Sequence, residues 1–329
     1  MARRYLVTGG AGYVGSHLVA ALAARGDTVV VLDNLRTGHR AAVPSGVQLI
    51  VADLADTGVV ETVLADGPWH AVFHFAALSQ VGESMRLPFR YLIDNGVNGM
   101  RLIEACVRHG VLRFVLSSTA ALYGTPDVVP ILEDAPLHPE SPYGDSKWFL
   151  ERTLHWAERV HDLRFASLRY FNAAGADPEG HFGEDHRPES HLIPLVIDAA
   201  LGRRPELEVY GCDYATPDGT CLRDYVHVTD LADAHLLALD RLERGSITVN
   251  LGNGTGHSVL QVIEAVQRVS GRKVPYRFCP RRPGDAAVLV ASSERAHREL
   301  GWRRRFADLD EIVRTALFWR EAHPNGYAS

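Results

Sequence analysis

The sequence has few cysteines and no histidine pair with the spacing of a metal motif. Only four of its 329 residues are cysteine, and they show neither a disulfide framework nor a metal-ligand spacing. We therefore expect reduced thiols at Cys106, Cys212, Cys221 and Cys279. The 16 histidines include no paired motif with zinc spacing, so the sequence predicts no metal site.

Long apolar runs and strong net charge are absent as well. No apolar run approaches the roughly 18 residues of a membrane span, and no apolar signal-peptide core precedes the first strand-like segment. The formal charge is −6, and basic groups such as residues 281–282 and 303–305 are short, which argues against nucleic-acid binding. We expect a cytoplasmic protein with neither a membrane nor a nucleic-acid partner.

The chain does contain a regular alternation of apolar runs and longer segments. The runs lie at residues 4–7, 28–33, 47–51, 71–75, 113–117 and 165–170, usually separated by helical patterns. This alternation predicts an α/β fold with a doubly wound parallel sheet. In such sheets ligands bind beyond the carboxyl ends of the strands, so the residues that follow each run are the most informative.

A glycine-rich stretch follows the first run. Gly9, Gly12 and Gly15 have a looser spacing than the strict dinucleotide fingerprint, but they lie where a strand turns into a helix, so backbone N–H groups can approach a pyrophosphate. About 20 residues on, the second run ends in Asp33, followed by Asn34 rather than arginine. A carboxylate there accepts a hydrogen bond from a ribose 2′-hydroxyl and repels a 2′-phosphate. This favours NAD over NADP. The alternatives are that the glycines form a turn with only a packing role, and that Asp33 is an ordinary turn residue after a strand.

Small and polar residues follow the later runs. Asp53 is placed to accept a hydrogen bond from the amino group of adenine. The small side chains of Ala76 and Ala77 leave room for a cofactor. A helix expected over residues 88–109 carries Asn95, which either faces the cofactor or caps local backbone. These positions fall on one rim of the predicted sheet.

The chemically strongest pattern is Tyr143-x-x-x-Lys147. Pro142 opens a helix that places the tyrosine and the lysine one turn apart on the same face. A phenol with a pKa of about 10 is a poor base at neutral pH unless positive charge stabilises the phenolate. Lys147 or an oxidised nicotinamide can supply that charge. The alternative is a surface lysine beside a packed tyrosine.

These motifs, in this order, resemble those of the extended short-chain dehydrogenase/reductases, which also share Ser117-Ser118-Thr119. Within that family the chain is similar to the UDP-glucose 4-epimerases, from about residue 4 to 324, most clearly at residues 8–17, 81–84, 168–172, 223–228 and 280–285. The resemblance implies a Rossmann-like fold, tightly bound NAD, and reversible 4-epimerisation of UDP-glucose and UDP-galactose through a 4-keto intermediate.

The resemblance also implies roles for single residues. Tyr143 is the expected catalytic base, Lys147 its electrostatic partner, and Thr119 the hydroxyl that orients the sugar. Further cofactor contacts are expected at Tyr13, Val14, Leu54, Phe75, Ser79, Ser117, Tyr170 and Phe171. Substrate contacts are expected at Asn172, His191, Leu192, Tyr210, Arg223, Tyr225, Arg282, Asp285 and Leu289, with the two arginines clamping the diphosphate and Tyr210 packing on uracil.

Some positions depart from the family's pattern, and others limit which reactions the site can catalyse. His191 stands where many members have asparagine, and Ser79 where some have lysine. Ala120 and Ala121 follow the active-site threonine where related dehydratases carry acids, so oxidation and re-reduction at one carbon is the simplest reaction. The alternatives are a 4-epimerase for another sugar, such as UDP-N-acetylglucosamine, and a non-catalytic NAD or nucleotide-sugar sensor.

The pattern also predicts how the chain divides. We expect residues 1–172 and about 223–252 to form an NAD-binding domain, and residues 173–222 and 253–329 to form a nucleotide-sugar-binding lobe, finished by helices near residue 296 and over 306–318. The resemblance implies a homodimer through helices such as those over residues 88–109 and 148–161.

Overall fold

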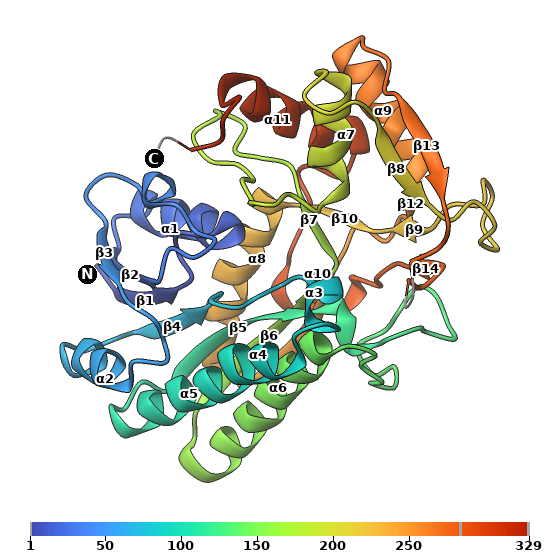
Figure 1. Cartoon of the computed structure of the whole chain (residues 1–329). Coiled ribbons are helices and arrows are strands. Elements are labelled where there is room, and N and C mark those ends of the chain that lie inside the picture. The colour runs from blue at the N-terminus through green and yellow to red at the C-terminus, as the bar shows by residue number, and fades with distance from the viewer. Residues whose placement is uncertain (1, 283–284, 328–329) are drawn as a thin grey trace.

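A seven-stranded parallel sheet forms the centre of the protein, whose computed structural model describes residues 2–282 and 285–327 (Figure 1). Every neighbouring pair of its strands is parallel. The order across the sheet is β3 (Gln48–Val51), β2 (Thr28–Asp33), β1 (Arg4–Thr8), β4 (Ala71–His74), β5 (Arg113–Thr119), β6 (Arg164–Tyr170) and β11 (Ile247–Leu251). The predicted doubly wound parallel sheet is confirmed.

Both faces of the sheet are buried because successive strand residues point to opposite sides. In β1, Tyr5 and Val7 enter one apolar core and Leu6 enters the other. The first core is covered by α1 (Tyr13–Ala24), α8 (Val228–Arg241) and α10 (Glu294–Leu300), and the second by α2 (Thr57–Ala65), α5 (Asn98–Arg108) and α6 (Pro142–His161). No described helix is both long and apolar enough to cross a membrane.

A third apolar core lies in a smaller lobe, at the upper right of Figure 1. It is built from α7 (Leu192–Ala200), α9 (Val259–Ser270), α11 (Leu309–Ala322) and the parallel pair β8 (Leu207–Tyr210) and β13 (Tyr276–Cys279). The lobe is joined to the sheet by short strands: β7 (Asn172–Ala174) with β10 (Tyr225–His227), and β9 (Leu222–Arg223) with β12 (His257–Ser258) and β14 (Val288–Leu289). The predicted domain limits stay a prediction, which the placement of β11 in the sheet supports.

Two segments differ from the sequence expectation. The helix expected over residues 88–109 is α4 (Pro88–Tyr91), a π-helical turn η2 (Leu92–Val97) and then α5, preceded by the short α3 (Val81–Ser84). Helix α10 packs on the sheet core through Ala296 and Leu300 rather than finishing the small lobe. The described residues also include three 3-10 turns: η1 (Arg40–Ala42), η3 (Ala120–Leu122) and η4 (Leu242–Arg244).

We expect Gly15→Ala to lower the free energy of unfolding by about 1–3 kcal/mol, because a methyl group at Gly15 would overlap the carbonyl oxygen of Gly9. Gly82→Ala is the matched control, since a methyl group there meets no atom within 4 Å. Urea unfolding of both variants measures the difference. If the two variants are equally stable, the backbone near Gly15 moves to accommodate the methyl group, and the prediction is wrong.

Candidate active site

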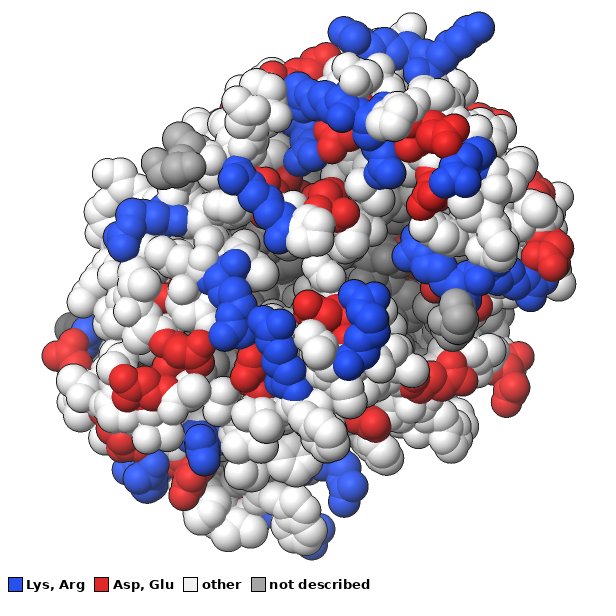
Figure 2. Space-filling model, viewed as in Figure 1, with Lys and Arg blue, Asp and Glu red and all other residues white. Residues whose placement is uncertain are grey.

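A deep cleft of about 1240 Å³ lies between the carboxyl edge of the sheet and the small lobe. Every residue predicted for cofactor or substrate contact lines it, from Gly9 at the first strand to Leu289 in β14. Figure 2 shows this face of the molecule, where basic side chains lie around a central hollow. The structure therefore brings together residues spread over most of the chain.

The glycine-rich turn forms one end of the cleft. Gly9 has a positive φ of 74° and lies against the backbone of Ala76, where any side chain would overlap. Gly12 is the N-cap of α1 and has no side-chain cap, so the first N–H groups of the helix are available to an anion. This cradle fits the pyrophosphate of a dinucleotide.

Two carboxylates lie beside the glycine turn. Asp33 accepts hydrogen bonds from the backbone N–H of Ala11 (3.0 Å) and Leu35 (2.8 Å), so it is both a turn acid and part of the cleft wall. Burial raises the pKa of the Asp33 carboxyl. Asp53 accepts a hydrogen bond from Asn34 at 2.7 Å. The predicted ribose and adenine acceptors are therefore held at one edge of the cleft.

Tyr143, Lys147 and Thr119 meet where α6 begins beside the end of β5. Ser141 caps the helix by accepting a hydrogen bond from Gly144 N at 3.2 Å. Lys147 is buried, and its Nζ donates to the carbonyl oxygen of Ser117 at 2.7 Å. The surface-lysine alternative is therefore wrong, and the lysine is fixed inside the site.

Burial and hydrogen bonding shift the pKa values of both members of the pair. Burial raises the pKa of Tyr143, and its hydrogen bond with Thr119 is what lowers it. Burial also lowers the pKa of Lys147 to about 8, against the raising effect of Glu151. The low-dielectric site thus penalises both charges, and a phenolate here needs further positive charge, such as that of an oxidised nicotinamide.

Asn95 binds the backbone of Leu78 and also lines the cleft, so its predicted contact with the cofactor stays a prediction. Its side chain accepts from Leu78 N (2.8 Å) and donates to Leu78 O (2.9 Å) and to Ser146 Oγ (3.2 Å). Ser146 in turn donates to the carbonyl oxygen of Tyr143 at 2.7 Å. The π-helical turn that carries Asn95 therefore fixes the start of α6 against the loop after β4.

A buried ion pair below the site was not foreseen from the sequence. Arg169 donates to both carboxylate oxygens of Glu151, at 2.6 Å in the shortest contact, and Ser118 donates to the same carboxylate at 2.6 Å. Glu151 lies one turn beyond Lys147 on α6. No local motif signals this pair, because its members are 18 residues apart and meet only in the folded chain.

The two predicted clamp arginines lie in the cleft wall of the small lobe. The Arg282 guanidinium lies 4.1 Å from the centre of the Tyr210 ring. Arg223 donates to the carbonyl oxygen of Ala286 at 2.8 Å and lies 3.5 Å from Asp285. Both side chains are thus held beside the residues predicted to contact the nucleotide-sugar.

His191 is engaged by acidic neighbours that the sequence analysis did not single out. Its Nδ1 lies 2.7 Å from Glu184 and 3.3 Å from Glu189, beside His186. Other unforeseen cleft residues are Arg36, which donates to Asp94 at 2.9 Å, and Arg86. None of them belongs to a recognised short motif.

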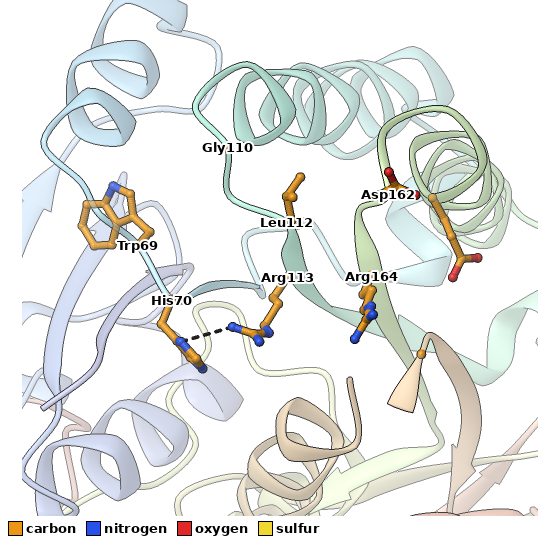
Figure 3. A pocket seen from close by; sticks show the side chains of 9 residues that line it. Trp69, His70, Gly110, Leu112, Arg113, Asp162 and Arg164 are labelled. Atoms are coloured by element: carbon orange, nitrogen blue, oxygen red, sulfur yellow. Dashed lines mark hydrogen bonds between the residues drawn. The ribbon is translucent and has the colours of Figure 1, made fainter. Parts of the chain in front are cut away.

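A second hollow, of about 600 Å³, lies at the opposite, amino ends of the strands (Figure 3). It is lined by His70, Arg113 and Arg164, which precede or begin β4, β5 and β6, and Arg113 donates to His70 at 3.3 Å. None of the predicted site residues lines it. Ligands of parallel sheets bind at the carboxyl ends, so the larger cleft is the candidate active site.

Comparison with known proteins agrees with this geometry. The model of the NAD dependent epimerase/dehydratase family matches residues 5–252. The chain belongs to this family. A family relative, the UDP-glucose 4-epimerase of Streptococcus mutans, is 48% identical over 98% of both chains.

Solved structures in the family share the whole architecture. The UDP-glucose 4-epimerase from Brucella ovis in complex with NAD is 43% identical, with a TM-score of 0.93 over 96% of this chain and 98% of that chain. The enzyme from Bifidobacterium longum in complex with NAD⁺ and UDP is 37% identical, with a TM-score of 0.94 over 98% of this chain and 100% of that chain.

Proposed function

We propose that the protein is an NAD-dependent isomerase that interconverts UDP-glucose and UDP-galactose by inverting the 4-carbon. The observation that carries this proposal is the single cleft in which the Tyr143–Lys147–Thr119 site lies between a dinucleotide cradle and two arginines. The high identity of full-length UDP-glucose 4-epimerases supports the same reaction.

The chain's own groups account for the proton transfer. Tyr143 takes the proton of the 4-hydroxyl, and Thr119 orients that hydroxyl from the end of β5. The glycine turn and Asp33 would hold NAD, which would supply the group that takes up the hydride from C4 of the sugar and returns it. Ala120 and Ala121 carry no group that could move a proton for elimination of water.

Inversion requires that the 4-keto sugar present its opposite face. We propose that Arg223 and Arg282 hold the diphosphate and Tyr210 packs on uracil, so that the hexose is held loosely enough to rotate. In this proposal residues 1–172 and 223–252 bind NAD, and residues 173–222 and 253–329 bind the nucleotide-sugar.

The reaction is tested by incubating purified protein with UDP-galactose alone and following UDP-glucose. We expect Tyr143→Phe to keep NAD and UDP binding but to lower kcat at least about 100-fold, because general-base catalysis contributes about 10²–10⁴. Tyr276→Phe, an exposed tyrosine in β13, is the control. Normal turnover by Tyr143→Phe would rule out this residue as the base, and no turnover by the wild type would support the sensor alternative.

A second panel of UDP-hexoses with and without the N-acetyl group decides between the sugars. Leu289 lines the cleft in β14, beside Arg223 in register, and we propose that its volume limits the hexose end. Preferred turnover of the N-acetylated sugars would move the proposal to a UDP-N-acetylglucosamine 4-epimerase.

The proposed binding of the diphosphate by Arg282 is tested by substituting two adjacent arginines, one in each variant. We expect Arg282→Met to raise the KM for UDP-galactose at least about tenfold, since a hydrogen bond to a charged group contributes about 1.5–3 kcal/mol. Arg281→Met is the matched control, because Arg281 pairs with Asp213 at 2.7 Å and does not line the cleft. Equal KM values for the two variants would remove Arg282 from the clamp.

A homodimer is proposed from the exposed apolar side chains on α4 and α6. Phe89 is 76% exposed and Trp156 is 59% exposed, and in Figure 1 their helices lie side by side with α5. We expect Trp156→Glu to convert the protein to monomers in sedimentation experiments, because the charge would be buried in the interface. Val128→Glu, in an equally exposed loop, is the control. Monomeric wild-type protein would overturn the proposal.

The cytoplasmic location expected from the sequence stays a prediction. Fractionation of the source cells, with detection of the untagged chain, tests it directly.

A further inference from the structure

We propose that Glu184, His186, Glu189 and His191 form a binding site for one Zn²⁺ ion at the rim of the cleft. Each residue offers one ligand atom, and the four atoms all lie within 4.8 Å of one another. Nothing in the proposed epimerisation requires this ion, so the site is a separate property of the chain.

The spacing of the four atoms resembles the edges of a coordination tetrahedron. With bonds of about 2.0–2.2 Å, zinc ligands are about 3.3–3.6 Å apart. Glu184 Oε1 lies 3.2 Å from Nδ1 of His186 and 2.7 Å from Nδ1 of His191. Glu189 Oε1 lies 3.9 Å and 3.3 Å from the same two nitrogens. These four distances, out of the six among the atoms, thus lie near the edge length of a coordination tetrahedron.

Glu184 Oε1 lies at ion-pair distance from the Nδ1 atoms of His186 and His191, but not in hydrogen-bond geometry with either. Glu184 Oε1 and the Nδ1 atoms of His186 and His191 are buried, yet none has a partner with hydrogen-bond geometry within the described part of the chain. The Glu184 side chain is only 7% exposed. Buried polar atoms normally make hydrogen bonds, so three that converge at ion-pair distance without hydrogen-bond geometry point to a shared cation.

The backbone around the cluster is fixed before any ion binds. Glu189 Oε1 accepts from the N–H groups of Ser190 (2.8 Å) and His191 (2.9 Å). Asp185 accepts from Tyr327 N at 3.0 Å through its carboxylate and from His39 Nε2 at 2.9 Å through its carbonyl. The segment is therefore preorganised by contacts with distant parts of the chain.

The donor set identifies the ion. Two imidazoles and two carboxylates suit zinc, whereas magnesium and calcium prefer oxygen ligands alone. The ring of His186 also lies 6.3 Å from that of Tyr13, which belongs to the dinucleotide cradle, and all four ligands line the cleft. A bound ion would thus brace the loop between the cradle and α7.

The full-length protein, treated with chelator and returned to buffer, is titrated with ZnCl₂ alone in a calorimeter. We expect one Zn²⁺ per chain, and a rise in Tm on binding because the ion binds only the folded state. Glu184→Gln and His186→Gln should each weaken zinc binding at least about tenfold. His181→Gln is the matched control: it is a histidine of the same loop, outside the cluster, that contacts Asp177.

A second measurement keeps the proposal testable if a cluster variant fails to fold. Co²⁺ bound to the wild-type protein should show the intense visible absorption of a four-coordinate site, lost on adding zinc. Absence of zinc binding by the wild type, wild-type affinity in both cluster variants, or an equal loss in His181→Gln would each overturn the site. A protein that binds no zinc but loses stability in the variants has only an ion pair there, which also overturns it. Epimerase activity is not the readout, so this failure is distinct from failure of the proposed reaction.

Discussion

The buried ammonium group of Lys147 is the constraint on which the catalytic site depends. The side chain is buried, and its Nζ donates to the Ser117 carbonyl at the end of β5. Burying an ammonium group is costly, and Glu151, one turn further along α6, favours its charged form. Because Glu151 is also paired with Arg169, the helix that presents Tyr143 is joined to two neighbouring strands by charge as well as by packing.

The same low-dielectric surroundings explain why the phenol alone is a weak base. Burial raises the pKa of Tyr143, and Thr119 lowers it only in part. In the proposed reaction, Tyr143 would therefore need the positive charge of NAD⁺ nearby to act as the base. Lys147 also holds the start of the helix on β5, because its Nζ donates to the carbonyl oxygen of Ser117.

The sequence was sufficient to predict the elements and site residues whose physical signal is local. Apolar runs such as residues 28–33 predict strands because both faces of a parallel strand are buried, and Tyr143-x-x-x-Lys147 predicts a shared helix face. The Arg169–Glu151 pair, the π-helical turn around Asn95 and the packing of α10 could not be predicted, because each depends on tertiary contacts. The Glu184–His191 cluster lies in a loop without periodicity, where spacing alone does not show which atoms converge.

The order of the strands along the chain has a consequence for synthesis on the ribosome. The edge strand β11 pairs with β6, yet the chain between them first builds β7, α7 and β8 outside the sheet. Until residue 251 has left the exit tunnel, the backbone edge of β6 lacks its neighbour and offers unpaired N–H and C=O groups to other chains. A nascent chain of this topology therefore exposes an unpaired strand edge while residues 171–251 are made, and slow codons before β11 would lengthen that interval.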